Sequence, residues 1–101
     1  VPGIDAVFIG PNDLHASMGL IPAFDSDSAE FNAALKKVFA SAKAHGVAPG
    51  IHVADATQAQ RRLNEGWQMI AVASEVGFML DKASEIVTSL GLGQHGPLAK
   101  Y

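Results

Sequence analysis

Residues 6–13 read AVFIGPND, and this stretch decides the fold. The apolar run Ala6–Ile9 is rich in β-forming residues and predicts a short strand. Residues 10–13, Gly-Pro-Asn-Asp, end that strand, because glycine and proline interrupt a β-ladder and Asn and Asp favour turns. For Leu14–Pro22 we predict a loop or a short helical turn.

Two further strand candidates follow at regular spacing, Ala48–Val53 and Met69–Ser74. Between the first two strands, residues 25–28 (Asp-Ser-Asp-Ser) offer several helix N-caps, and Gly46 ends the helix that they begin. The apolar residues of that helix recur with a helical period and form one stripe: Phe31, Leu35, Val38, Phe39 and Ala42.

The remaining two helices follow the second and third strands. Asp55 or Thr57 caps a helix whose Ala59 and Leu63 share a face and which Gly66 ends. The last helix, Val76–Leu90, has the most regular apolar stripe of the chain: Val76, Met79, Leu80, Ala83, Ile86, Val87 and Leu90. We expect residues 1–91 to form a partial barrel domain and residues 92–101 a flexible tail.

The order strand, helix, repeated three times, indicates an α/β fold with a parallel sheet and right-handed crossovers. The first and third strands lack polar alternation, so we expect cover on both of their faces. In a (β/α)8 barrel of about 250 residues, opposing strands fill the second face, and three units match the last part of such a barrel. A doubly wound sheet, with helices on both faces, is the alternative that periodicity leaves open.

Composition excludes several classes of function. The 101 residues carry a net charge of −3 and no cysteine, and only 17% are charged, against about 25% in typical soluble domains. No basic stripe suits nucleic acid, no apolar run reaches the roughly 18 residues of a membrane helix, and no signal peptide is apparent. We expect a cytoplasmic protein without disulfides or thiolate metal sites. The chain begins with Val1 directly before a strand, so we expect it to be part of something longer.

Ligands of α/β folds bind at the carboxyl ends of the strands, which here are Gly10–Asp13, His52–Asp55 and Ser74–Glu75. Gly10 lets a ligand approach the backbone, and the N–H groups of Asn12 and Asp13 could hold a carboxylate. The Asp13 side chain is a hard oxygen ligand suited to Mg²⁺ or Mn²⁺. The alternative is a tight turn in which Asn12 or Asp13 caps the next helical turn.

The stretch IDAVFIGPNDLHASMG at residues 4–19 resembles the segment GVDGVFIGPADLSASLG of the HpcH/HpaI aldolase/citrate lyase family. The likeness continues through GVAPGI at residues 46–51 and LNEGWQMIAVASE at residues 63–75, and it covers about residues 3–90. Members of this family are metal-dependent aldolases that act on 2-oxo acids, on a barrel of the phosphoenolpyruvate/pyruvate type. The first motif is specific, and the other two support it.

The resemblance implies roles for two residues, Asn12 and Asp13. Asp13 matches the second metal-binding carboxylate of the family, and the N–H groups of Asn12 and Asp13 match those that hold the carboxylate of pyruvate. The implied cofactor is a divalent ion, Mg²⁺ or Mn²⁺ or else Co²⁺, which stabilises the enolate formed on carbon–carbon cleavage. The family's metal-binding Glu, catalytic Arg and His/Asp base pair lie upstream of the matching region. We therefore expect the isolated chain to lack aldolase activity.

Four residues depart from the family pattern. His15 stands where Ser is usual, His52 where an apolar residue often lines the substrate entrance, and Ala73 and Glu75 where Gly and Asp are frequent. His52 follows a strand and would point toward the catalytic rim, where it could contact a polar or acidic, aldehyde-derived part of a substrate. For both histidines the alternative is a hydrogen-bonded imidazole at the rim or surface.

The other side chains that could carry chemistry have simpler interpretations. We expect solvated carboxylates at Glu30 and Glu65, a solvated helix face at Arg61 and Arg62, and a packing role for Trp67. Met18 and Met79 are expected in the core, His45 at a helix end and His95 in the tail. A Schiff-base lysine would be expected on a strand. None of the lysines of the chain lies on a predicted strand; they are Lys36, Lys37, Lys43, Lys82 and Lys100.

The sequence therefore favours part of an aldolase whose small-molecule substrate is a 4-hydroxy-2-oxo acid. A non-catalytic module is the second hypothesis, because the Val76–Leu90 helix could bind a partner helix, and the family resemblance implies a homo-oligomer formed through it. A small phosphate-binding doubly wound protein is the third, and the absence of a GxGxxG or Walker sequence weakens it.

Overall fold

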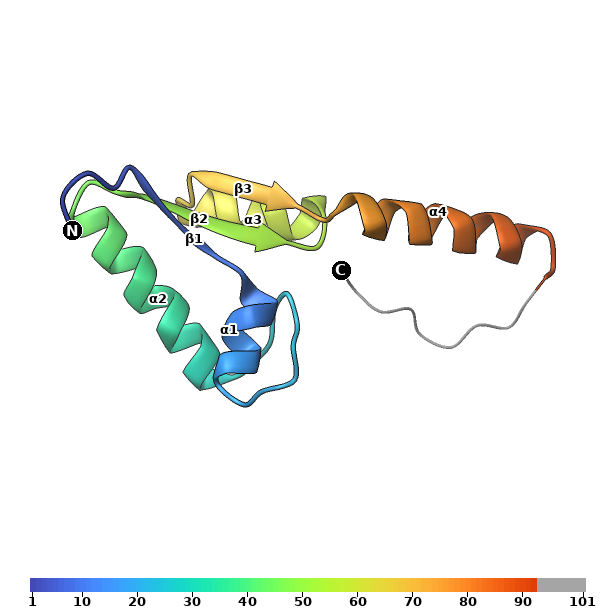
Figure 1. Cartoon of the computed structure of the whole chain (residues 1–101), viewed down its shortest axis with the longest axis horizontal. Coiled ribbons are helices and arrows are strands. Elements are labelled where there is room, and N and C mark those ends of the chain that lie inside the picture. Colours follow the sequence, from blue (N-terminus) through green and yellow to red (C-terminus); the bar gives the residue numbers. More distant parts are fainter. Residues whose placement is uncertain (93–101) are drawn as a thin grey trace.

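The computed structural model describes residues 1–92. Its centre is an open sheet of three parallel strands, β1 (Ala6–Ile9), β2 (Ala48–Val53) and β3 (Met69–Val72), in the order β1-β2-β3 (Figure 1). Ile51 of β2 pairs with Ile9 of β1 on one side and with Ile70 of β3 on the other. The predicted order and parallel direction of the strands are confirmed.

Four helices follow the strands: α1 (Pro11–Ser17), α2 (Ala29–Ala44), α3 (Ala56–Glu65) and α4 (Glu75–Ser89). Three of them begin at a side-chain cap that accepts a backbone N–H three residues later, namely Ser28, Asp55 and Ser74. Gly66 ends α3 in the left-handed conformation, with φ of 103°, which glycine adopts without steric cost. The predicted caps and stops of α2 and α3 are therefore confirmed.

Several boundaries differ from the predictions, and those of α4 do so by one residue at each end, since it was predicted as Val76–Leu90. A helix begins already at Pro11, because proline at the first helical position has a suitable φ and lacks only an N–H that would have no partner. The third strand ends at Val72 rather than Ser74, because Ala73 turns the chain with φ of 53°, a value rare for a residue with a side chain.

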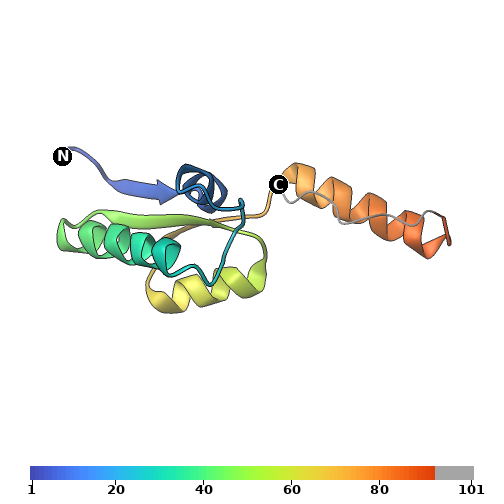
Figure 2. The same cartoon turned by 90° about the horizontal axis from the view of Figure 1, so that it is seen from below.

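The helices α2 and α3 cover the same face of the sheet (Figure 2). The chain moves across the sheet in one direction, from β1 to β2 to β3. Because each crossover is right-handed, successive helices then lie on the same side of the sheet. The core between these layers consists of Ile9, Phe31, Leu35, Ile51, Val53 and Trp67. A doubly wound sheet has helices on both faces, so this arrangement excludes it for residues 1–92, and one-sided cover is the pattern of consecutive units of a (β/α)8 barrel.

The opposite face of the sheet is open. Phe8 and Met69 lie in register with Gly50 between them, and they are 48% and 42% exposed. A Cβ at Gly50 would lie 2.8 Å from the Met69 Cε atom and 3.0 Å from the Val7 carbonyl oxygen, so a side chain there would displace its neighbours. Within residues 1–92 the expected cover on both faces is not present, and the apolar strands remain half uncovered.

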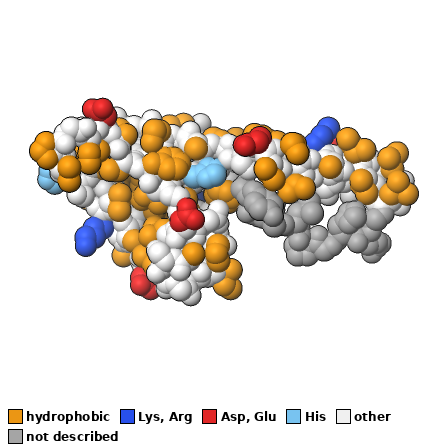
Figure 3. Space-filling model, viewed as in Figure 1, with side chains coloured by type: hydrophobic (Ala, Val, Ile, Leu, Met, Phe, Trp, Pro, Cys, Tyr) orange, Lys and Arg blue, Asp and Glu red, His pale blue; other side chains and the backbone are white. Residues whose placement is uncertain are grey.

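Helix α4 extends away from the sheet, and none of its residues is buried (Figures 1 and 3). The chain measures 54 × 25 × 23 Å and has a radius of gyration of 16.3 Å, whereas a compact chain of this length has about 13 Å. Met79 is 68% exposed, so its predicted place in the core is wrong: nothing in residues 1–92 packs over this helix deeply enough to bury it. No described helix is long and apolar enough to cross a membrane. Apart from Leu92, the predicted tail lies outside the described residues.

Candidate functional site

The candidate site lies at the carboxyl edge of the sheet, where β1 leads into α1. Gly10 is the N-cap residue of α1 and has no side chain to satisfy the first N–H groups, and Pro11 has no N–H. The backbone N–H groups of Asn12 and Asp13 are therefore the first donors of the helix, and no side chain caps them. The partial positive charge of a helix start favours an anion at this position.

The Asp13 carboxylate folds back over Gly10. A Cβ at residue 10 would lie 2.9 Å from Asp13 Oδ2, so only glycine leaves room for the carboxylate in this position. Asp13 is exposed, and no ion pair or hydrogen bond within residues 1–92 engages its side chain. The arrangement leaves a hard oxygen ligand unpaired beside the uncapped N–H groups of α1.

A divalent ion needs more ligands than Asp13 provides. No group of three His, Asp or Glu side chains within residues 1–92 lies close enough to hold a metal ion. The chemistry of the Asp13 carboxylate suits Mg²⁺, Mn²⁺ or Co²⁺, but a complete coordination shell requires donors from outside this part of the chain. Glu30 and Glu65, expected as solvated carboxylates, are both exposed on helices, but Glu65 also pairs with Arg62 and accepts a hydrogen bond from Trp67.

His15 is buried, with 1% of its surface exposed, so its predicted place at the rim or surface is wrong. Its ring stacks on Phe31 at 3.9 Å between centroids. The Nδ1 atom lies 2.7 Å from the Pro11 carbonyl oxygen and the Nε2 atom 2.8 Å from Ser26 Oγ. The predicted hydrogen bonding is thus present, and it joins α1 to the loop before α2.

His52 lies on the open face of the sheet, near the carboxyl end of β2. Side chains alternate along a strand, and the neighbours Ile51 and Val53 both point into the core, so His52 points the other way. Its Nε2–H donates to the Ala73 carbonyl oxygen at 2.6 Å. The Phe24 ring stands nearly perpendicular to the imidazole, with centroids 5.0 Å apart. No hydrogen bond within residues 1–92 joins His52 to the Gly10–Asp13 segment.

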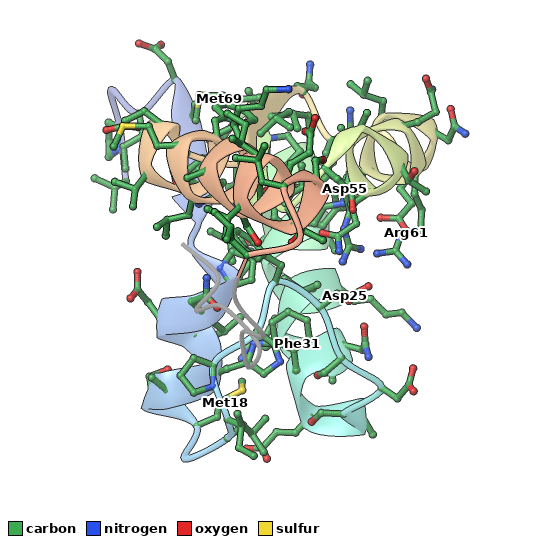
Figure 4. The ribbon with its side chains drawn as sticks, turned by 90° about the vertical axis from the view of Figure 1, so that its right-hand side faces the viewer. Met18, Asp25, Phe31, Asp55, Arg61 and Met69 are labelled. Carbon is green, nitrogen blue, oxygen red and sulfur yellow. The ribbon has the colours of Figure 1, made fainter. Side chains whose placement is uncertain are left out.

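Arg62 is 7% exposed, so the predicted solvated face is wrong at this position. Its guanidinium pairs with Asp25 at 3.3 Å and with Glu65 at 3.0 Å. Arg61 is half exposed, as predicted, and also pairs with Asp25; Figure 4 shows these two side chains facing each other. Leu63, expected to share the apolar face of α3, is 50% exposed. Sequence spacing gives no sign of Asp25, which comes 37 residues before Arg62.

The remaining predictions concern packing. Trp67 is buried against Phe39, as expected, and its Nε1–H donates to Glu65 Oε2 at 3.1 Å. Met18 packs against the core, as expected. His45 lies exposed at the end of α2, while His95 and Lys100 lie outside the described residues.

Comparison with known proteins identifies the family. Residues 1–82 match the family described as HpcH/HpaI aldolase/citrate lyase. The chain belongs to this family. It is 38% identical over 79 residues to a hydroxypyruvate/pyruvate aldolase of Paraburkholderia phytofirmans, covering 78% of this chain and 30% of that protein. It is also 36% identical over 92 residues to a 4-hydroxy-2-oxo-heptane-1,7-dioate aldolase of Salmonella typhimurium, covering 91% and 34%.

Solved HpcH/HpaI structures share the fold. A family protein from Burkholderia cenocepacia superposes with a TM-score of 0.78 at 31% identity, covering 89% of this chain and 34% of that one. An aldolase from Desulfitobacterium hafniense gives a TM-score of 0.80 at 27% identity, covering 96% and 38%. The chain spans about a third of the length of these HpcH/HpaI relatives. The three βα units are therefore part of the family's (β/α)8 barrel, as the sequence predicts.

Proposed function

We propose that the chain supplies part of a divalent-metal-dependent aldolase, which cleaves a 4-hydroxy-2-oxo acid to pyruvate, or a related 2-oxo acid, and an aldehyde. The aldolase names of its relatives support this reaction class. The observation that carries the proposal is the Asp13 carboxylate lying over Gly10 at the uncapped start of α1. Residues 1–91 are then one part of the catalytic barrel.

Each element at the β1–α1 junction has a role in this proposal. The N–H groups of Asn12 and Asp13 donate to the carboxylate of the 2-oxo acid, which the positive helix start also attracts. Gly10 leaves space for the Asp13 side chain, whose oxygen is one ligand of the ion. When bound, Mg²⁺, Mn²⁺ or Co²⁺ supplies positive charge opposite the negative charge that develops as the carbon–carbon bond breaks.

His52 is the proposed contact for the aldehyde-derived part of the substrate. It lies on β2, the strand next to β1, and its ring is on the face that the helices leave open. Neighbouring strands lie about 5 Å apart, so a ligand bound at the end of β1 extends readily across β2.

The isolated chain is proposed to be inactive. Asp13 is a single ligand, and the described residues offer no group of three side chains that could hold the ion. A lone carboxylate gives neither a held ion nor a base positioned at the reacting hydroxyl. Activity therefore requires the rest of the barrel.

The test restores that missing part. In the barrel chimera, residues 1–92 replace the matching segment of the Paraburkholderia phytofirmans aldolase, and pyruvate binding is measured by calorimetry with and without Mn²⁺. We expect Mn²⁺-dependent binding that Asp13→Asn abolishes. Asp5→Asn is the matched control, since Asp5 is an exposed aspartate before the opposite end of β1. Binding that is equal in both variants would overturn the proposal.

A second function, self-association through α4, has its own support. This helix and its C-cap residue expose a set of large apolar side chains: Val76, Phe78, Met79, Ile86 and Leu90. Exposed apolar surface on a projecting helix favours packing against another helix, so the complete protein is proposed to be a homo-oligomer. Sedimentation of the chimera with and without Met79→Lys tests this: we expect the substitution to reduce the size of the assembly.

A further inference from the structure

Three consecutive residues in the loop between α1 and α2 contact three different elements. The Phe24 ring lies against His52 of β2, the Asp25 carboxylate pairs with Arg61 and Arg62 of α3, and Ser26 Oγ bonds to His15 of α1. We call residues 24–26 the clasp. Figure 4 shows Asp25 and Arg61 pointing toward each other across the space between loop and helix.

The clasp is held more tightly than an ordinary surface loop. Phe24 is 8% exposed, although loops usually run over the surface, whereas Ile21 nearby in the same loop is 88% exposed. The Asn32 side chain donates to the Ser26 carbonyl oxygen at 3.0 Å. Arg62, one of the two partners of Asp25, is itself buried. The loop is thus fixed at residues 25 and 26, directly beside the ring that touches His52.

The hydrogen bonds also determine the tautomer of each neutral imidazole. A carbonyl oxygen only accepts, so His15 carries its proton on Nδ1, toward Pro11, and accepts the Ser26 hydroxyl at Nε2. By the same argument His52 carries its proton on Nε2, toward Ala73, and Nδ1 has the lone pair. The two histidines therefore have opposite tautomers.

The Nδ1 atom of His52 is available to a ligand. No partner for it occurs within residues 1–92, and no buried side-chain nitrogen or oxygen there lacks a partner, so this atom is accessible. An accessible lone pair accepts a hydrogen bond from a hydroxyl, whereas it repels a carboxylate, which only accepts. The hydrogen bond to Ala73 and the contact with Phe24 hold the orientation of the ring and therefore the position of Nδ1.

We propose that the clasp positions His52 so that Nδ1 accepts a hydrogen bond from a hydroxyl group of the ligand, which selects hydroxylated over unhydroxylated aldehyde parts. Asp25 and Ser26 act as positioning residues, because they hold the loop that carries Phe24. This inference rests on the proposed function for the identity of the ligand, but the tautomer and the role of the clasp do not depend on it.

The first test is nitrogen-15 NMR of the imidazoles in the full 101-residue chain, repeated on the barrel chimera. We expect the Nε2–H tautomer at His52 and the Nδ1–H tautomer at His15. Asp25→Asn and Phe24→Leu should shift the His52 signals toward a mixture of tautomers, and Asp27→Asn, an exposed neighbour outside the clasp, should leave them unchanged. A Nδ1–H tautomer at His52, or signals that neither clasp variant alters, would overturn the inference.

The second test compares kcat/KM of the chimera for the aldol addition of pyruvate to glycolaldehyde and to acetaldehyde. One net hydrogen bond gives about fivefold preference for the hydroxylated aldehyde, and His52→Leu should remove it. Asp25→Asn should lower the preference mainly through KM, with kcat retained. An unchanged preference in His52→Leu contradicts the inference. If the chimera binds no pyruvate while the tautomers are as expected, the proposed function is wrong, but the conclusion that the clasp positions His52 still stands.

Discussion

Replacing Gly10 with alanine should separate the stability of the fold from the chemistry of the site. The new Cβ would lie 2.9 Å from Asp13 Oδ2, and ordinary contact begins at 3.4 Å. The carboxylate must therefore move by about 0.5 Å, because the backbone of β1 and α1 is far harder to displace than the end of one side chain.

The effect of Gly10→Ala on folding should be small. The backbone at residue 10 has φ of −92° and ψ of 102°, which alanine adopts without strain. Alanine is a poorer N-cap than glycine by about 0.5–1 kcal/mol. It also lowers the conformational entropy of the unfolded chain, which stabilises the folded state by a similar amount. These effects offset each other, so the free energy of unfolding should change by less than about 1 kcal/mol.

The effect of Gly10→Ala on binding should be large. A ligand displaced by half an ångström no longer matches the short, directional bonds of a divalent ion, and comparable disturbances weaken metal binding by about 10- to 100-fold. Urea denaturation of the chain gives the stability, and Mn²⁺ titration of the barrel chimera gives the affinity. Unchanged Mn²⁺ affinity would refute the reasoning about the carboxylate, and a loss of more than about 2 kcal/mol of stability would refute the reasoning about the backbone.

Three further predictions concern the fold: one tests a single substitution and two compare a pair of substitutions, each by chemical denaturation. Ala73→Gly should stabilise the chain by up to about 1 kcal/mol, because it relieves the φ of 53°, and a loss of stability would contradict this. Arg62→Ala should cost about 1–3 kcal/mol, since it removes a buried guanidinium from two carboxylates, whereas the half-exposed Arg61→Ala should cost less than about 1 kcal/mol. In the isolated chain, Phe31→Ala should cost about 3–5 kcal/mol, and Phe8→Ala on the open face should cost much less than that and much less than it costs in the chimera. Equal costs for Arg61→Ala and Arg62→Ala, or for Phe8→Ala and Phe31→Ala in the isolated chain, would contradict the assigned burial.

Sequence patterns predicted the order of elements well because local chemistry determines it. Ser28 and Asp55 begin α2 and α3, and Gly66 ends α3, each through groups only a few residues away. The apolar runs of β1 and β2 became strands with the predicted bounds. Capping, turn formation and periodicity are short-range effects, so they can be recognised in the sequence without knowledge of the fold.

Burial was harder to predict because it depends on contacts between distant residues. His15 is buried because Ser26 and Phe31 close over it, and Arg62 because Asp25 reaches it from another loop. The exposure of Met79 has the opposite cause: its helix shows a regular apolar stripe, yet no residue of that helix is buried. Periodicity predicts that a face is apolar, but it does not say what covers that face.

The candidate site was predictable only in part. The family motif singled out Gly10 and Asp13, and the resemblance assigned them a role, but the carboxylate lying over the glycine is a three-dimensional fact. The clasp at residues 24–26 had no sequence signal beyond a row of possible caps. Its contacts join elements as many as 37 residues apart, which no local pattern records.

The central claim is that Asp13 holds a divalent ion against a 2-oxo acid bound at the start of α1. Electron paramagnetic resonance of Mn²⁺ in the barrel chimera tests it most directly. We predict bound Mn²⁺ whose spectrum changes on addition of pyruvate, with affinity at least about tenfold weaker in Asp13→Asn and unaltered in Asp5→Asn. A chimera in which Asp13→Asn binds Mn²⁺ and responds to pyruvate as the parent does would contradict the claim.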